Sequence, residues 1–535
     1  MVKLLRQGYG SPVFFGEKRN EKGCEQVGRR RTPGTDRTVM SENANKTLTR
    51  EEDGKQVKMK SLALDLVETG TDEANRAADL KVTKHLPDGV TSRMLYADIV
   101  HIAWPSLVEL TLTQLASMVD LMMVGQLGPW ALTAVGLTTQ PKFLLMTMFM
   151  AMNVGSTAMV ARYKGAGDQK RANEVLRQSL LMTLVFGLAA SVVGYLFAEP
   201  LIRFMGAKEA EVLAAATSYL RIQMIGLVGV ALTSTITATL RGVGNSKTAM
   251  IYNMIANVVN VIFNYLLIYG HFGFPRMEVA GASLATIIGQ FVAMFMAFFV
   301  VMNGSQYLRF RFRDGLKPNI PEIKKIVDIG IPAMIEQLVM RVGLIIYSKT
   351  VAGLGTLAYA IHQVCMNIQS LSFMNGQAFA VSATSLMGQS LGKKRHDMAQ
   401  AYTSRTRKLG MAVSIFLAVI FFFFGGQIVA LYSGGDQSLV ELGGKIMMFV
   451  AFVQPFQSSQ LILAGALRGA GDTKVTAVIT FVTVLLVRPG LAIFCINVLG
   501  MGLEGAWVAL VVDQLLRSLL VLLRYNSGGW KRHTM

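Results

Sequence analysis

The octapeptide "LRGVGNSK" at residues 240–247 returns as "LRGAGDTK" at residues 467–474, 227 positions further along the chain. The same offset matches residues far outside the octapeptides: Pro105 with Pro332, Glu109 with Glu336, Gly128 with Gly355, and Gly165 with Gly392. After a three-residue slip, "AGASLATIIGQ" (280–290) matches "EGAWVALVVDQ" (504–514). A match of this extent predicts two homologous halves rather than one duplicated turn.

The composition is that of a membrane protein. Of the 535 residues, 52% are hydrophobic and 16% are charged, a balance that soluble domains rarely reach. A bilayer core takes about 20 apolar residues per helix, and twelve segments qualify as spans. They are residues 96–124, 131–160, 176–198, 212–239, 248–270, 280–303, 326–351, 357–386, 408–432, 440–466, 475–498 and 503–524. We therefore expect an all-α membrane protein with twelve transmembrane helices in two parallel-repeat six-helix lobes.

The chain divides by composition into five parts. The polar and charged residues 1–93 predict a disordered cytosolic N-terminal tail. Residues 94–303 form the expected N-lobe and residues 326–525 the C-lobe, with a basic cytosolic linker at 304–325 between them. Residues 526–535 form a short cytosolic C-terminal tail.

Lysine and arginine gather in alternate connections between the spans. The connections after the second, sixth and eighth spans are basic, whereas "GQLGPW" (125–130) and "NVLGMGLE" (497–504) carry neither residue. Since cytosolic loops retain positive charge, we expect a multi-pass protein of the cytoplasmic membrane with both termini and both octapeptides in the cytosol. The net charge of +19 follows from this asymmetry and from the tail, so it indicates no nucleic-acid partner.

The octapeptide looks like a phosphate-binding loop but lacks its spacing. A Walker loop needs a Gly directly before its Lys, and Ser246 stands there instead, between two predicted helices rather than after a strand. We interpret Gly242 and Gly244 as the means of a tight turn, with Arg241 and Lys247 holding that turn at the cytosolic surface. No nucleotide partner is expected, so active transport has to use an ion gradient.

The duplicated architecture favours transport. Two similar bundles enclose a central cavity, and rocking one against the other opens that cavity to alternate sides of a membrane. A non-transporting receptor is a distant alternative without a positive signal. An enzyme is not expected, because the chain has only six His without a motif, and its three Cys match no metal or redox spacing.

Four polar side chains lie within the predicted spans of the first half. Asp120 lies in the first span, Asn260 and Asn264 lie one turn apart in the fifth, and Thr286 lies in the sixth. Counted from the outer ends of their spans, Asp120, Asn264 and Thr286 reach a similar depth, roughly 12 Å. A charge inside a span is a functional hypothesis by default. Oxygen ligands from several helices suit a hard cation such as Na⁺, and the carboxylate alone suits a proton. We predict that these four residues couple transport to a cation.

The second half provides an internal control for this prediction. The counterparts of Asp120, Asn260, Asn264 and Thr286 are Tyr347, Val487, Leu491 and Leu510, which are mostly apolar. Fold geometry alone does not require such a difference. The alternative is that the Asn and Thr side chains only hydrogen-bond between helices, which is common in membranes. We favour the coupling role.

Other charges within the spans have open roles. Glu109 and Glu336 each follow a Pro by four residues, and each either relays protons or bonds a backbone group that the Pro frees. Because both halves have this Glu, the structural role is favoured. Asp513 and Arg517, one turn apart, are expected to neutralise each other. Three further cations either face the cavity or pair with carboxylates: Arg341, Lys349 and Arg488.

Several stretches resemble the multidrug and toxic compound extrusion (MATE) family in its prokaryotic DinF- and NorM-like form. They are "PSLVELTLTQLASMVDLMMVGQLG" (105–128), "LRGVGNSK" (240–247), "GASLAT" (281–286) and "LGTLAYAIHQV" (354–364), and the resemblance covers residues 95–525. It implies an antiporter that exports amphipathic or cationic drugs and toxic metabolites in exchange for Na⁺ or H⁺. We accordingly expect no permanently bound cofactor, small organic substrates and membrane lipids as partners, and a monomer.

The resemblance also bears on the site residues. In the DinF-like branch, a first-span Asp, a fifth-span Asn and Asp, and a sixth-span Thr form the cation site, and Asp120, Asn260 and Thr286 match them. Asn264 stands in place of the second Asp. In the NorM-like branch, carboxylates of spans seven and ten take part, but Met340 and Gln457 lie there, so that site is expected to be absent. Related families flip lipid-linked saccharides, which is the main alternative function, although the mixed charges within the spans weigh against it.

Overall fold

The structure, a computed structural model, describes residues 90–532 apart from residues 208, 305, 312, 314, 316 and 431–436 and the side chains of Thr356 and Ser438. The predicted tail of residues 1–93 lies outside the described residues except for its last four, which lead into the first helix. Of the predicted C-terminal tail, residues 526–532 are described. Trp530 in this segment is buried and stacks on Tyr525, so these residues pack against the last long helix.

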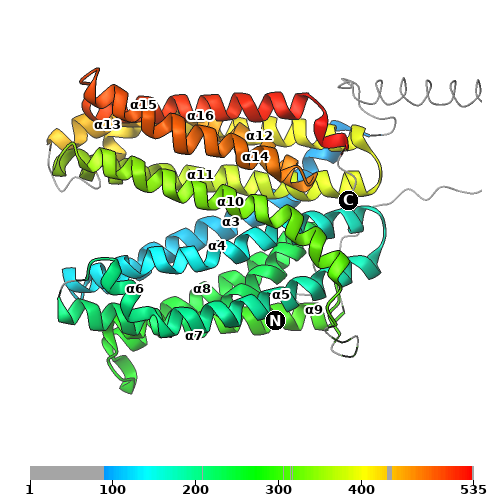
Figure 1. Cartoon of the computed structure of the whole chain (residues 1–535), viewed down its shortest axis with the longest axis horizontal. Coiled ribbons are helices and arrows are strands. Elements are labelled where there is room, and N and C mark those ends of the chain that lie inside the picture. The colour runs from blue at the N-terminus through cyan, green and yellow to red at the C-terminus, as the bar shows by residue number, and fades with distance from the viewer. Residues whose placement is uncertain are drawn as a thin grey trace, which may run out of the picture. The chain divides into compact units, whose positions relative to one another are not determined.

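The first half of the described chain contains six long helices (Figure 1). They are α3 (Ser92–Gly125), α4 (Pro129–Gly165), α5 (Gln169–Leu196), α7 (Ala210–Gly242), α8 (Ser246–Tyr269) and α9 (Glu278–Met302). Two short elements were not predicted from the sequence: α6 (Ala198–Phe204), which follows α5, and the 3-10 turn η1 (His271–Gly273), which follows α8.

The second half repeats this order. Its long helices are α10 (Ile320–Ala352), α11 (Thr356–Gly392), α12 (His396–Ala430), α13 (Gln437–Gly469) and α16 (Gly502–Asn526). The span between α13 and α16 is composite: α14 (Thr473–Thr480), a π-helical segment η3 (Phe481–Val487) and α15 (Arg488–Asn497). A 3-10 turn, η4 (Gly529–Arg532), follows α16. Helix α10 begins six residues inside the predicted linker, so the connection between the halves is shorter than expected.

The helices confirm the predicted fold class of twelve transmembrane helices in two lobes. By length and composition, eleven helices of the described chain are apolar enough to cross a membrane. The remaining predicted span is α11, which is a helix of 37 residues but has a more polar middle. Each predicted span coincides with one continuous or composite helix, and several helices extend beyond the apolar stretch. The length of the apolar stretches therefore located the spans but underestimated the lengths of the helices.

The octapeptides form tight turns, as predicted. Gly244 and Gly471, the second Gly of each, both have φ of 84°, a left-handed conformation that favours glycine. The first Gly of each has a different role from the one predicted. A Cβ on Gly242 would lie 2.8 Å from the carbonyl oxygen of Thr157, and one on Gly469 would lie 2.3 Å from that of Thr384. The first Gly thus permits close helix packing, and the second permits the turn.

The first helix of each half crosses into the other half. We call the end of the bundle where α4, α7, α11 and α13 finish the linker end, and the opposite end the far end. Near the linker end, Ile99 and Ile102 of α3 pack into a core with Phe379 and Leu467 of the second half. In the same way, Ile326 of α10 belongs to a core built by the first half. The two lobes are therefore tied together by exchanged segments of α3 and α10.

The lobes meet most closely at the C-terminal ends of α4 and α11. A Cβ on Gly165 would lie 2.0 Å from the carbonyl oxygen of Gln389, and a Cβ on Gly392 would lie 2.0 Å from that of Arg162. Because the two glycines are equivalent in the repeat, the contact is itself two-fold. We call this crossing the linker-end seam, and it leaves no room for any side chain at either glycine.

Candidate functional site

The structure brings the four predicted cation-coupling residues together. Asp120 lies on the far half of α3, Asn260 and Asn264 lie on α8, and Thr286 lies on α9. The amide nitrogen of Asn264 donates to Oδ1 of Asp120 at 2.5 Å. Asn260 is satisfied when its amide nitrogen faces the carboxylate, donating to Oδ1 and Oδ2 of Asp120 at 2.9 and 3.1 Å. Its oxygen then accepts from the backbone N–H and the hydroxyl of Thr286 at 3.2 and 3.3 Å.

The reverse orientation of Asn260 is physically unfavourable. It keeps a hydrogen bond to Thr286 at 3.3 Å but turns the amide oxygen toward the negatively charged carboxylate. We therefore describe the site with both amide nitrogens donating to Asp120. The carboxylate has no cationic group within the 4.0 Å of an ion pair in the described chain, so its charge is balanced by amide dipoles and by more distant groups.

One polar atom of the site has no partner. Oδ1 of Asn264 is buried and accepts no hydrogen bond from any residue that the structure describes. The Asn264 side chain as a whole is fully buried, and Asn260 is 7% exposed. A buried carbonyl oxygen without a donor is costly. Placed beside a carboxylate, it is a ready ligand for a cation, because turning the amide about its last bond presents this oxygen to the space near Asp120.

The equivalent position in the second lobe is built differently. Tyr347, the counterpart of Asp120, is fully buried and donates its hydroxyl to the backbone oxygen of Ala506 at 2.9 Å. Val487, the counterpart of Asn260, ends the π-helical segment, and Leu510, the counterpart of Thr286, is buried in an apolar core. The asymmetry that the sequence predicts between the halves is therefore present in the structure.

A buried ion cluster lies beside Tyr347 instead. Asp513 accepts from Arg488 at 2.5 Å and from Arg517 at 2.6 Å, and all three side chains are at most 6% exposed. The predicted pair of Asp513 and Arg517 is thus part of a triad, and Arg488 pairs with a carboxylate rather than facing the cavity. The guanidinium carbon of Arg488 also lies 5.7 Å from the ring centre of Tyr347.

Glu109 and Glu336 occupy equivalent ion pairs. Glu109 binds Arg241 at 2.8 Å, and Glu336 binds Arg468 at 2.8 Å. Each carboxylate also accepts a hydrogen bond from a polar side chain. Glu109 accepts from Asn253 of α8 at 2.6 Å, and Glu336 accepts from Thr476 of α14 at 3.3 Å. The expectation that Arg241 lies at the surface is wrong, because the buried carboxylate of Glu109 draws its side chain inward. The geometry supports the favoured structural role of both carboxylates.

Sequence reasoning missed one charged residue near the site. Lys142 lies within α4 and interacts electrostatically with Asp120, at more than ion-pair distance. A lysine inside the predicted span 131–160 was sufficient signal to find it. Arg341, whose role the sequence left open, faces the other half: its guanidinium carbon lies 4.4 Å from the ring centre of Phe143 on α4. Lys349 is exposed.

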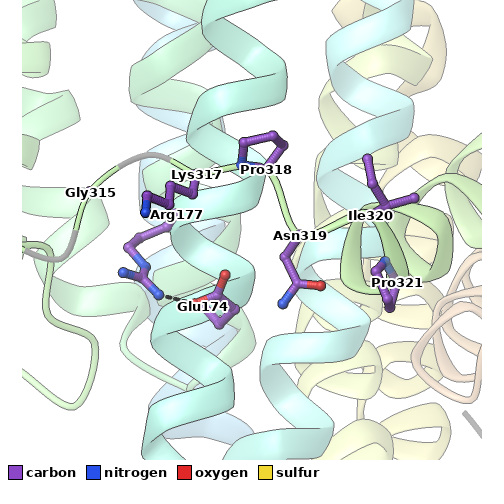
Figure 2. Close-up of a pocket in the computed structure, with 8 residues that line it drawn as sticks. All are labelled: Glu174, Arg177, Gly315, Lys317, Pro318, Asn319, Ile320 and Pro321. Atoms are coloured by element: carbon purple, nitrogen blue, oxygen red, sulfur yellow. Dashed lines mark hydrogen bonds and ion pairs between the residues drawn. The ribbon is translucent and has the colours of Figure 1, made fainter.

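Two surface pockets lie away from Asp120. One, of about 470 Å³, is formed where the linker crosses the start of α5; Figure 2 shows Glu174 and Arg177 paired there, with linker residues 317–319 running past them. Gln178 fixes this linker by donating to the carbonyl oxygen of Lys317 at 2.9 Å. The other, of about 540 Å³, lies between the end of α5, α6 and α7 and includes Tyr195 and Arg221.

Two six-helix lobes joined along exchanged helices, with charged and polar groups buried differently in each, define a membrane transporter with an internal repeat. The family model described as MatE matches residues 105–266 and 332–494, one block in each half and together more than half of the chain. The chain therefore belongs to the MatE family. Membership of this family confirms that the protein is a transporter and not an enzyme.

Relatives and solved structures agree with this assignment. The probable multidrug resistance protein NorM of Thermotoga maritima is 28% identical over 439 residues, covering 82% of this chain and 94% of its own. The multidrug resistance protein PmpM of Pseudomonas aeruginosa is 28% identical over 399 residues, covering 74% and 83%. The structure of a MOP superfamily transporter from Pyrococcus furiosus matches with a TM-score of 0.76 at 21% identity, covering 84% of this chain and 100% of that one.

Proposed function

We propose that the protein is an antiporter of the cytoplasmic membrane that exports amphipathic or cationic drugs and toxic metabolites in exchange for Na⁺ or H⁺ bound in the first lobe. The names of its relatives support multidrug efflux. The single observation that carries the coupling proposal is the unpartnered oxygen of Asn264 beside the carboxylate of Asp120. Both termini and the linker end lie in the cytosol in this proposal, as the basic connections predict.

In this proposal, cation binding replaces the hydrogen-bond donors that face Asp120 with oxygen atoms that face the cation. With the site in its described arrangement, two amide nitrogens stabilise the carboxylate. A Na⁺ ion would bind to the carboxylate and to the oxygen of Asn264 once that amide turns, with Asn260 and Thr286 as further oxygen donors. A proton would instead neutralise Asp120 and convert one of its oxygens into a donor for the free oxygen of Asn264. Both events change the hydrogen bonds between α3 and α8.

Helix α3 connects this change to the other lobe. Asp120 lies near the far end of α3, whereas Ile99 and Ile102 near its linker end are packed into the second half. Pro105 lies between these two parts of the helix. A Pro inside a helix removes one hydrogen bond and allows a bend. The two ends of α3 can thus respond differently to occupancy of Asp120, which provides a route from cation binding to lobe movement.

Substitution of Asp120 tests the proposal. In everted vesicles with an imposed cation gradient, we expect Asp120→Asn to reduce efflux of an amphipathic fluorescent dye at least about tenfold, because the site loses its only charged ligand. The matched control is Glu441→Gln, which changes an exposed carboxylate of α13 whose side chain is 75% accessible. Undiminished efflux in Asp120→Asn, at equal protein in the membrane, would remove Asp120 from the mechanism.

A further inference from the structure

Within the described chain, two cations of helices α4 and α10 are held by neither an ion pair nor a hydrogen bond, a state that they share with Arg221 of α7. Lys142 of α4 and Arg341 of α10 form neither an ion pair nor a hydrogen bond with any residue that the structure describes. Three buried carboxylates and the partly buried Asp120 are satisfied differently, the former each by at least one arginine and Asp120 by two amides: Glu109, Glu336, Asp513 and Asp120. The uncompensated charge in this part of the molecule is therefore positive.

Both cations lie at similar depth on α4 and α10, two helices that contact each other across the halves. Lys142 is 13 residues from the far end of α4 at Pro129, and Arg341 is 11 residues from the far end of α10 at Ala352. At about 1.5 Å per residue, these positions are roughly 20 and 17 Å along their helices. The guanidinium of Arg341 reaches across to the ring of Phe143, the residue next to Lys142, with 4.4 Å to the ring centre.

The contacts of Lys142 and Arg341 within the protein explain little of why two positive charges stand within the spans. A charged side chain in the middle of a span is costly and is rarely found there without a partner or a function. The contact between the Arg341 guanidinium and the Phe143 ring offsets only part of that cost. The nearest opposite charge to Lys142 is Asp120, which lies beyond ion-pair distance and already accepts two amides. Unlike Arg221, these two cations lie on helices of different lobes that contact each other, so an anion that is not part of the chain can be bound between the lobes.

We propose that Lys142 and Arg341 bind the acidic group of the cargo, a carboxylate, sulfonate or phosphate carried by an amphipathic molecule. The guanidinium of Arg341 lies over the ring of Phe143, 4.4 Å from its centre, and its N–H groups, which form no hydrogen bond with any described residue, can bind two oxygens of such a group as a fork. Lys142 adds a second charge from the other lobe, and Phe143 supplies apolar surface for a ring. This inference rests on the proposed transport function and narrows its cargo to acidic and zwitterionic amphiphiles.

The proposal changes how cargo and cation relate. An acidic cargo does not displace a cation from Asp120 by charge repulsion, so exchange has to be enforced by movement of the lobes rather than by direct competition. The diphosphate of a lipid-linked saccharide has the same chemistry as a soluble acid. A competition experiment distinguishes a lipid-linked acidic group from a soluble one. If the site admits the lipid, a polyprenyl diphosphate displaces a bound dye far better than free diphosphate does.

A series of dyes with one ring system tests the proposal. Rhodamine 6G is a cation, rhodamine B a zwitterion and sulforhodamine B an anion, and binding of each to the purified full-length protein is measured by fluorescence anisotropy. We expect sulforhodamine B to bind most tightly. Lys142→Gln and Arg341→Gln are each expected to weaken its binding about tenfold, as for loss of one charged hydrogen bond, and to leave rhodamine 6G unchanged or improved.

Arg221→Gln is the matched control. Arg221 lies 11 residues from the start of α7, at a depth similar to that of Arg341, and its guanidinium also rests on an aromatic ring, 5.7 Å from the centre of Tyr195. It lies on the α5 side of the first lobe, so its loss should not affect any dye. Thermal melting of each variant confirms that it is folded.

The outcomes separate this inference from the proposed function. Preference for rhodamine 6G, or equal binding of sulforhodamine B by the wild type and both variants, overturns the acidic-cargo inference and leaves cation-coupled efflux intact. The converse result, selective anion binding that depends on both cations without any gradient-driven dye flux in proteoliposomes, supports the site and overturns the antiport proposal.

Discussion

At the scale of single residues, Asn264 distinguishes the two halves most sharply. It is fully buried, it donates to Asp120, and its own oxygen is unpartnered among the residues described. Its counterpart in the second half is Leu491, at an equivalent place on a transmembrane helix. A leucine is thus compatible with the helix, and the amide is explained by what it does next to a carboxylate.

This comparison leads to a prediction for Asn264→Leu. We expect gradient-driven dye efflux to fall about tenfold or more. The cation loses one oxygen ligand, and Asp120 loses a hydrogen bond that contributes about 1.5 kcal/mol or more. The measurement is efflux from vesicles under a saturating gradient. The control is Asn257→Leu, which removes a half-buried amide of the same helix that donates to Thr113 of α3 at 3.1 Å, away from Asp120. Efflux that equals the wild type would show that Asp120 functions without Asn264.

The pair of Glu109 and Arg241 leads to a prediction of stability. Glu109→Gln leaves a largely buried guanidinium without its counter-charge, so we expect a loss on the order of 2 kcal/mol and a lower melting temperature in detergent. The equivalent Glu336→Gln should have a similar effect, because its ion pair with Arg468 has the same length. The double variant Glu109→Gln/Arg241→Gln should recover part of the loss.

A proton relay would give a different result at these positions. If Glu109 or Glu336 carried protons, the Gln variants would shift the pH dependence of efflux while the melting temperature stayed unchanged. We expect the reverse: an unchanged pH profile at reduced stability, and a smaller loss of efflux than in Asp120→Asn.

At the scale of helices, the linker-end seam determines how the lobes meet. Gly165 and Gly392 face carbonyl oxygens of the opposite helix at a distance that no Cβ tolerates. We expect Gly165→Ala to force α4 and α11 apart and to destabilise the protein by about 1–3 kcal/mol. The matched control on the same helix is Gly136→Ala, where a Cβ would meet nothing within 4 Å. Equal melting temperatures for the two variants would show that the seam is not closely packed.

The composite span of the second half shows a further difference between helices. Helix α8 is continuous, whereas its counterpart contains the π-helical segment at Phe481–Val487 directly before Arg488. A π-turn contains an additional residue and rotates the positions that follow. Accordingly, Arg488 is buried against Asp513, while Val487, the counterpart of Asn260, is only half-buried. The segment thus turns Arg488 toward the ion cluster.

Sequence patterns predicted where the helices lie along the chain better than which helices contact each other. Apolar length located all twelve spans, and the repeat with its Asp120 and Asn264 predicted an asymmetric site. The crossing of α3 and α10 between the lobes was not predicted, because apolar length does not identify which helices touch. The inward turn of Arg241 was missed for a similar reason: a residue at a helix end can either be solvated or pair with a buried carboxylate, and only the fold decides.

At the scale of the whole molecule, a symmetric scaffold carries an asymmetric distribution of charge. The turns, the seam and the ion pairs of Glu109 and Glu336 recur in both halves. The proposed cation site of the first lobe is not repeated in the second: the first lobe has Asp120 among amides, and the second has Asp513 between two arginines. This asymmetry is what the proposed binding of a cation in the first lobe requires, since the carboxylate of the second lobe is already paired with two arginines.

The coupled movement of cargo and cation tests this account most directly. A concentration gradient of an amphipathic fluorescent dye, the cargo, is imposed on proteoliposomes that contain the purified protein. The opposing movement of ²²Na⁺ and of protons is recorded in separate experiments. The account predicts that cargo drives one of these two cations in the opposite direction in the wild type and in Glu441→Gln, and neither cation in Asp120→Asn. Cargo movement without an opposing cation, or counter-movement that persists in Asp120→Asn, would contradict a coupling site in the first lobe.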